Sequence, residues 1–261
     1  MDLDSVGLIR RSAFLLRLLA TAGKRGLALT ELSAKSNLPH STVHRLLKQL
    51  SAEGLTFQSL ETRRYLLGPL AYELGLAASD LFDFRSLCQP IIRRIAQSTE
   101  DTVYLVLRSG FDAVCLDRID GTFPIRTITL DVGSRRPLGI GAGGLAILAA
   151  CDKNECRRIV HATEAQLGEV YKLTSDDQFA AVAETRAQGF SLVQNRLSLG
   201  VTAVGLAFCD SMNQPVGAIS IAGVQSRMSS TRRENIVTTL RNSVSIIERA
   251  IREQRPIFVS R

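Results

Sequence analysis

The sequence predicts an α+β protein with two domains, a small helical one followed by a larger one that mixes helices and strands. Three observations predict this organisation. Residues 30–50, TELSAKSNLPHSTVHRLLKQL, form two short amphipathic segments around a tight break. Two strand-like runs joined by a polar turn follow directly. From residue 80 onward, runs with the period of a strand alternate with runs of helical period.

The first helix of the small domain is expected after Ser12, a plausible N-cap, with an end at Gly23. Thr30 is the expected N-cap of the next, short helix. Glu31 lies in the first turn of that helix, where a negative charge is favourable to the helix dipole. The sequence Asn37-Leu38-Pro39 then predicts the break between the two short helices.

Proline is tolerated at a helix start, so Pro39 predicts a further helix that runs to about Glu53 and stops before Gly54. Strands are expected at 55–58 and 65–67 around the turn SLETRR, followed by a helix at 70–79. A helix–turn–helix followed by a β-hairpin is the arrangement of a winged helix. We therefore expect a winged helix-turn-helix domain at 1–70, with the helix–turn–helix at about 30–50 and the wing at about 55–67. A linker helix at 71–80 and a second domain at 81–261 complete this prediction.

The second domain is predicted from alternating patterns along residues 81–261. The expected helices cover 84–99, 144–150, 153–162, 176–188 and 231–254, and the expected strands cover 103–107, 113–119, 126–130, 190–193, 201–208 and 216–221.

The third helix carries the pattern of a DNA-reading helix. Its apolar residues Val43, Leu46, Leu47 and Leu50 share one face at spacings of three and four. The remaining faces present hydroxyls and basic groups, which are the groups that reach base edges and phosphates. The expected DNA contacts are Ser41, Thr42, His44, Arg45 and Lys48 on this helix, and Arg63 and Arg64 on the wing.

Two other interpretations of this helix are disfavoured by the residues around it. An ordinary surface helix with solvated charges is disfavoured by the preceding short helix, the tight break and the following hairpin. A metal site at His40 and His44 has the right i, i+4 spacing but lacks the glutamate that follows the first histidine in metalloproteases. No metal site is therefore expected.

The charge distribution supports an anionic partner for the small domain. The chain has a formal net charge of +7, and residues 1–70 hold ten Lys and Arg against five Asp and Glu. The other 191 residues are nearly balanced, at twenty-two against twenty. Five cysteines without a CxxC pair, together with the absence of a signal peptide and of a long apolar span, predict a cytoplasmic protein with reduced thiols.

A glycine run at 139–144, GIGAGG, formally matches the dinucleotide fingerprint G-x-G-x-x-G. The preceding strand and the acidic residue about 20 positions later that this fingerprint requires are missing, so no nucleotide cofactor is expected. The run opens an apolar helix, and it is interpreted either as an anion-binding helix N-terminus or as a tight turn. Catalytic motifs such as G-x-S-x-G and HExxH are absent, and no enzymatic activity is expected.

Several ordered blocks resemble the IclR family of bacterial transcriptional regulators. They are LTELSAKSNLPHSTVHRLLKQLSAEG, YLLGP, VGSRRPLGIGAGGLAILAA and VTAVGLAFCDSMNQPVGAISIAG, with Arg227 shortly after. The resemblance implies a GAF-like effector-binding domain with a mixed or antiparallel sheet flanked by helices. It also implies a homodimer or homotetramer whose operator binding responds to a small organic acid, often an aromatic one. Repression is expected rather than activation.

The resemblance places effector contacts at Gly141, Ala142, Ala203 and Ser220, and further contacts are expected at Asn195 and Arg196. Arg196 stands where the family usually has glutamate, which suggests a more anionic ligand. Two alternatives remain at this stage: an enzyme with an accessory winged helix, and a DNA-associated interaction protein without a small-molecule ligand.

Overall fold

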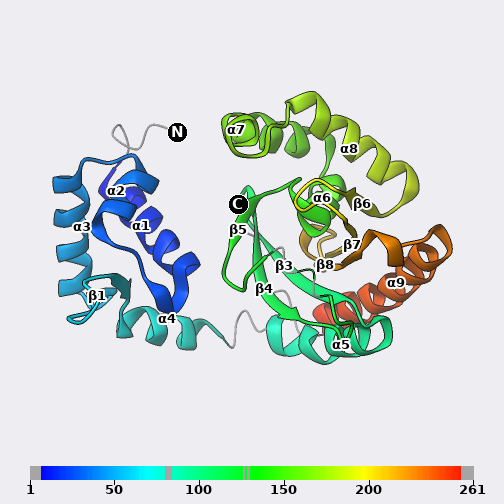
Figure 1. Ribbon diagram of the computed structural model, residues 1–261, viewed down its shortest axis with the longest axis horizontal. Helices are drawn as coiled ribbons and strands as arrows, with labels where there is room; N and C mark the ends of the chain where they lie inside the picture. The colour runs from blue at the N-terminus through cyan, green and yellow to red at the C-terminus, as the bar shows by residue number, and fades with distance from the viewer. Residues whose placement is uncertain (1–6, 80–83, 126, 128–129, 254–261) are drawn as a thin grey trace. The chain divides into compact units, whose positions relative to one another are not determined.

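A computed structural model of the chain describes residues 7–79, 84–125, 127 and 130–253. The chain divides into two compact units, with helices α1 to α4 in the first and α5 to α9 in the second (Figure 1). No described helix is long and apolar enough to cross a membrane.

The first unit is a three-helix domain with a short antiparallel hairpin. Its elements are α1 (Leu8–Ala22), a 3-10 turn (Gly23–Arg25), α2 (Leu29–Ser36), α3 (His40–Ala52), β1 (Thr56–Gln58), β2 (Tyr65–Leu67) and α4 (Pro69–Ser79). Leu27 bridges to Tyr65 and so extends the hairpin by a third short segment. The leucines of α1, α2 and α3 form the core, and Leu15, Leu32 and Leu47 are fully buried in it.

Two of the predicted helix starts are wrong. α1 begins at Leu8 with Gly7 as its N-cap, because no residue between Gly7 and Ser12 interrupts a helix. α2 begins at Leu29 with Ala28 as its N-cap, and Thr30 lies inside the helix. The capping group is instead the Glu31 carboxylate, which accepts a hydrogen bond from the Ala28 N–H at 2.7 Å.

The second unit is built on one antiparallel sheet in the order β5-β4-β3-β8-β7-β6. Its strands are β3 (Thr102–Ser109), β4 (Asp112–Ile119), β5 (Arg135–Pro137), β6 (Ser191–Gln194), β7 (Val201–Cys209) and β8 (Pro215–Val224). Its helices are α5 (Phe84–Thr99), α6 (Gly141–Ala150), α7 (Lys153–Tyr171), α8 (Ser175–Gln188) and α9 (Ser230–Glu253).

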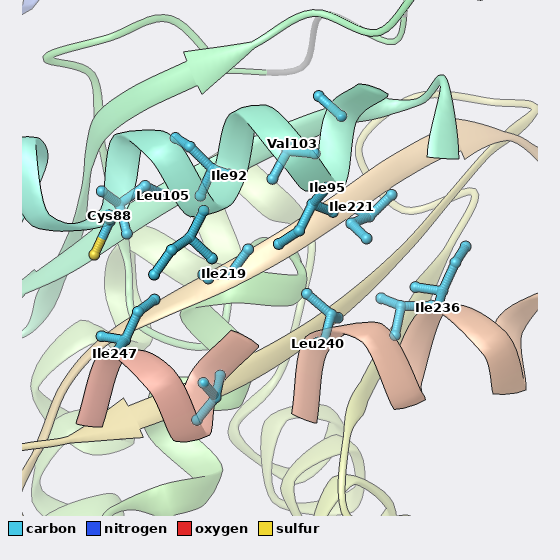
Figure 2. Packing of buried hydrophobic residues seen from close by; sticks show 14 of the residues in the cluster. Cys88, Ile92, Ile95, Val103, Leu105, Ile219, Ile221, Ile236, Leu240 and Ile247 are labelled. Carbon is cyan, nitrogen blue, oxygen red and sulfur yellow. The ribbon is translucent and has the colours of Figure 1, made fainter. Parts of the chain in front are cut away.

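Helices α5 and α9 cover one face of this sheet. Figure 2 shows Ile92 and Ile95 of α5 and Leu240 and Ile247 of α9 pointing toward Ile219 of β8. All five side chains are buried. Alternate residues of the strands therefore supply one apolar core on this face, as the period of two in a strand requires.

The other face of the sheet packs against α6, which is buried along nearly its whole length. Helices α7 and α8 cover the outside of α6, and their residues Ile159 and Val182 join its core. An unbroken apolar run such as LAILAA suits this position, because a helix enclosed by protein has no polar face.

The second unit departs from the sequence-based expectations in several places. α6 starts at Gly141, so Gly143 and Gly144 lie within the helix and not before it. α7 runs past 162 to Tyr171, because its first left-handed residue is Lys172. The short strand β5 was not predicted, and most of the strand expected at 126–130 lies outside the described residues.

All five cysteines are free thiols, and four of them are buried. Burial raises the pKa of Cys88 and of Cys115 to about 12. These side chains therefore act as small apolar groups in the core and not as nucleophiles.

Glycines allow α6 to approach the sheet closely. A Cβ atom at Gly205 of β7 would lie 2.7 Å from the Ala142 carbonyl oxygen, and one at Gly143 would lie 2.7 Å from a methyl group of Val106. The Ser191 hydroxyl donates to the same Ala142 carbonyl at 2.6 Å. The first turn of α6 is thus held against β6 and β7 at backbone distance.

We predict that Gly205→Ala lowers the free energy of unfolding by about 1–3 kcal/mol, because the added methyl group must displace α6. Urea denaturation of the full chain measures this change. The matched control is Gly168→Ala in α7, where an added Cβ meets nothing within 4 Å. This control should gain up to about 1 kcal/mol from helix propensity. Equal stability of the Gly205 variant and the unmodified chain would contradict the close-approach account.

Candidate functional site

The predicted reading residues gather on the outer side of α3. Ser41, His44, Arg45 and Lys48 are exposed and Thr42 is half-buried, while the four apolar residues of the helix face the core. None of these five polar side chains forms a hydrogen bond or ion pair with another described residue. The face therefore presents two hydroxyls, an imidazole and two cations that are available to an external partner.

The hairpin is fixed to α3 through polar groups. Thr56 is 1% exposed, and its hydroxyl lies 2.9 Å from the Ser51 hydroxyl. The same Thr56 hydroxyl donates to the Leu47 carbonyl at 3.4 Å, and the Leu55 N–H donates to the Leu50 carbonyl at 2.9 Å. The wing therefore follows the position of α3.

The two wing arginines occupy different environments. Arg63 is exposed, adopts a left-handed backbone conformation with φ 56°, and its side chain forms no hydrogen bond or ion pair with a described residue. Arg64 instead forms an ion pair with Glu31 at 2.6 Å and donates to the Arg25 carbonyl at 3.0 Å. These contacts hold Arg64 against the helix–turn–helix, while its side chain stays about one third exposed and lines the open cleft beside the wing.

The Arg64–Glu31 contact also shapes the electrostatics of the domain. The hydrogen bond from the Ala28 N–H and the one from Arg64 hold the pKa of the Glu31 carboxyl below its ordinary value. Glu31 thus caps α2 in its charged form while it binds the base of the wing. One carboxylate links the helix–turn–helix to the hairpin.

The structure adds basic residues that the sequence analysis did not single out. Lys24 and Arg25, in the turn after α1, line an open cleft together with the exposed ring of Phe57 on β1. The rest of this cleft is formed by Ser59, Thr62, Arg64 and Leu66. The sequence shows Lys24 and Arg25 as a basic pair after the first helix. The Leu27–Tyr65 bridge and the Arg64–Arg25 hydrogen bond bring this pair beside the wing.

His40 and His44 both lie exposed on α3. Among the residues that the structure describes, no group of three or more His, Cys, Asp and Glu side chains is placed to hold a metal ion.

The second unit contains a cavity at the start of α6. Its volume is about 50 Å³, and the floor is formed by strands β3, β7 and β8. Five of the six effector contacts expected from the family resemblance line it: Gly141, Ala142, Arg196, Ala203 and Ser220. The others that line it are Tyr104, Val106, Ala113, Leu130, Arg136, Ile140, Gly143, Gly144, Val193, Leu197, Ser198, Val201 and Ala222.

The polar groups of this cavity are suited to an anion. The N-terminus of α6 opens into it, and no described side chain caps that terminus. Ser220 is 6% exposed and lines the cavity, so its hydroxyl adds a polar group to the wall. Arg136 and Arg196 add positive charge at the wall.

Asn195 does not line the cavity. Its backbone is left-handed with φ 55°, and its side-chain oxygen accepts a hydrogen bond from the Gly200 N–H at 2.7 Å. Asn195 therefore shapes the loop that carries Arg196, Leu197 and Ser198 over the cavity. The contact expected of Asn195 is thus replaced by a positioning role.

The wall residues missed by the sequence analysis come from strands far apart in the chain. Tyr104 of β3 is one of these wall residues. Its hydroxyl donates a hydrogen bond to the Thr127 carbonyl at 2.6 Å. The alternation of β3 places Tyr104 and Val106 on the cavity side. Strand period gives the two faces of β3, but only the sheet order shows which face meets α6.

Comparison with known protein families covers both units. The profile of the IclR helix-turn-helix domain matches residues 9–59. The profile described as the bacterial transcriptional regulator IclR C-terminal domain matches residues 77–249.

Individual relatives agree with these matches. The HTH-type transcriptional regulator KipR of Bacillus subtilis is 25% identical over 229 residues, which cover 87% of this chain and 91% of that protein. The transcriptional repressor IclR of Escherichia coli is 27% identical over 213 residues, or 78% of this chain and 76% of that protein.

Solved structures share the fold over nearly the whole chain. An IclR transcriptional regulator from Silicibacter sp. TM1040 superposes with a TM-score of 0.80 at 22% identity, covering 97% of this chain and all of the other. An IclR homologue from Microbacterium hydrocarbonoxydans, solved with 4-hydroxybenzoate, gives 0.71 at 17% identity and covers 94% and 99% of the two chains.

Together, the helix–turn–helix, the antiparallel sheet with its flanking helices and the two family matches show that this chain belongs to the IclR family of DNA-binding bacterial transcriptional regulators.

Proposed function

We propose that this regulator reads an operator through the outer side of α3 and releases or retains it according to a small carboxylic acid bound at the start of α6. The observation that carries the proposal is the set of polar side chains on α3 without partners. Ser41, Thr42, His44, Arg45 and Lys48 face outward from a helix whose other side is locked in the core.

The division of work between these residues follows from their chemistry. Arg45 and Lys48 can donate to guanine and to phosphates, and the hydroxyls of Ser41 and Thr42 can reach either bases or phosphates. Further cations lie on the wing, at Arg63, and beside it, at Lys24 and Arg25. Phosphate contacts from these residues would set the register of the protein on DNA.

We propose repression as the direction of control, since several relatives are named as repressors, among them IclR of Escherichia coli and the acetate operon repressor of Salmonella typhimurium. We also propose a symmetric oligomer, because two reading helices are needed for a two-fold operator. Helix α4 supports this, since it exposes the apolar side chains of Tyr72, Leu74 and Leu76 by 55% or more.

The cavity limits the size of the effector. The cavity volume of about 50 Å³ is small, which favours a small ligand where the walls do not move. A small aliphatic carboxylic acid fits this volume better than an aromatic one. Its carboxylate would meet the α6 N-terminus and the Ser220 hydroxyl, with Arg196 at the wall.

Arg196 lies at the cavity wall, and its positive charge also acts on the nearby Asp177 carboxyl. Hydrogen bonds from Thr174, and secondarily the charge of Arg196, hold the pKa of the Asp177 carboxyl below its ordinary value. Arg196 makes no direct ion pair with a described residue. A second carboxylate on the ligand would therefore find a cation at the cavity wall.

For the DNA interface, we predict that Arg45→Ala weakens specific operator binding by about 1–3 kcal/mol, the worth of one good base contact. Fluorescence anisotropy with operator and random duplexes at equal salt measures the change. Lys153→Ala, which removes one exposed positive charge from the start of α7, is the matched control and should leave binding unchanged. Unaltered discrimination between operator and random DNA in the Arg45 variant would count against the assignment.

For the effector site, we predict that a panel of small carboxylic acids contains one that raises the melting temperature of the full chain. At a hundredfold excess over its Kd, the stabilisation should be about 2.7 kcal/mol. Arg196→Ala should reduce the shift, whereas Arg157→Ala on the exposed side of α7 should not. An acid that stabilises the Arg196 variant as strongly as the unmodified chain would refute the role of Arg196.

A further inference from the structure

The tip of the wing carries a leucine that has no packing role in the domain. Leu60 is 90% exposed, among the most exposed large apolar residues that the structure describes. Leu60 lies in the turn between β1 and β2 and is not part of the core of the first unit, whose leucines are buried. A single exposed apolar residue is common on protein surfaces, so the exposure of Leu60 gains meaning only from the position and charges of the turn that carries it.

The turn that carries Leu60 is held rigidly. The Ser59 N–H donates to the Arg64 carbonyl and the Arg63 N–H donates to the Ser59 carbonyl, both at 2.9 Å. The Thr62 N–H donates to the Ser59 hydroxyl at 3.1 Å, and the Gln58 amide donates to the Arg63 carbonyl at 2.9 Å. With Arg63 left-handed, these bonds point the tip outward in one conformation.

The tip also moves with the reading helix. Thr56 fixes the base of the hairpin to Ser51 and Leu47 of α3. Leu60 lies four residues after Thr56, in the turn beyond the end of β1, so the chain between them spans at most about 13 Å. Adjacent grooves of B-DNA are offset by about half of its 34 Å repeat. A tip at this reach from a helix in the major groove arrives at the neighbouring minor groove.

The charges around the tip fit that groove. Arg63 has no partner among the described residues, and Lys24 and Arg25 stand beside the base of the wing. Glu61 is the one carboxylate in the turn, so cations remain in excess. The negative potential of a minor groove attracts arginine, and an apolar side chain held among such cations can enter between base pairs.

We propose that Leu60 is an apolar wedge that enters the minor groove beside each half-site and bends the operator, with Arg63 anchoring it. The proposal rests on the proposed function, because it needs α3 in the adjacent major groove. A wedge of this kind kinks the duplex by about 20–90° toward the major groove. The bend should favour flexible pyrimidine–purine steps, so the protein would select sequence at the wedge without hydrogen bonds to the bases there.

The test uses the full chain and the duplex that it binds most tightly after selection from random DNA. Fluorophores at the two ends of this duplex report bending by energy transfer. Leu60→Ala should lose at least half of the bend while specific affinity falls by no more than about tenfold. Leu199→Ala is the matched control, because Leu199 is also 90% exposed but lies in the second unit. It should bend the duplex as the unmodified chain does.

A second arm replaces the flanking pyrimidine–purine step with a stiff A-tract. This change should weaken binding of the unmodified chain but not of the Leu60 variant. Undiminished bending by Leu60→Ala, or an equal effect of the A-tract on both proteins, overturns the proposal. Undiminished bending together with an altered oligomeric state would assign Leu60 to a protein contact instead. If the unmodified chain selects no sequence from the random pool, the proposed function itself fails.

Discussion

The close approach of α6 to the sheet is the constraint on which the second unit depends. The backbone of α6 meets β7 at Gly205, and the Ser191 hydroxyl binds the Ala142 carbonyl at 2.6 Å. This contact places an uncapped helix N-terminus above the strands and leaves a cavity of about 50 Å³ between them. The opening glycines are therefore packing residues, and in the proposed function they also form the mouth of the anion site. The two interpretations of the glycine run that the sequence left open are compatible in the structure.

In the first unit, some polar side chains form hydrogen bonds or ion pairs that hold the wing to the helices, and others form none with described residues. Thr56, Glu31 and Arg64 fix the wing to the helices through buried or paired contacts. Arg45, Lys48 and Arg63 have no partner among the described residues. A surface with unpaired cations on a rigid frame loses little order on meeting phosphates, so binding energy is not spent on arranging the domain. A rigid domain of this kind keeps the ordering cost of the proposed DNA binding small.

Most elements could be predicted from the sequence, because apolar periodicity is strong in α3, α5 and α9. The errors have identifiable causes. Glu31 reaches back to cap α2, which no local rule at Thr30 reveals. Asn195 has the residue type of a binding site but does not line the cavity, because it holds the Gly200 N–H, and the partner of Arg64 lies 33 residues away in the chain. The cavity walls, such as Tyr104, depend on the sheet order. Pairings between distant residues are what the sequence pattern could not supply.

The central claim is that the acid at α6 and the operator at α3 are energetically coupled, and reciprocity tests it most directly. Operator affinity is measured with and without a saturating concentration of the acid that stabilises the chain, and acid affinity is measured with and without operator. The account predicts that both affinities change by the same factor, about 5–150-fold, as linkage requires. An operator affinity that stays constant when the acid site is full would contradict it.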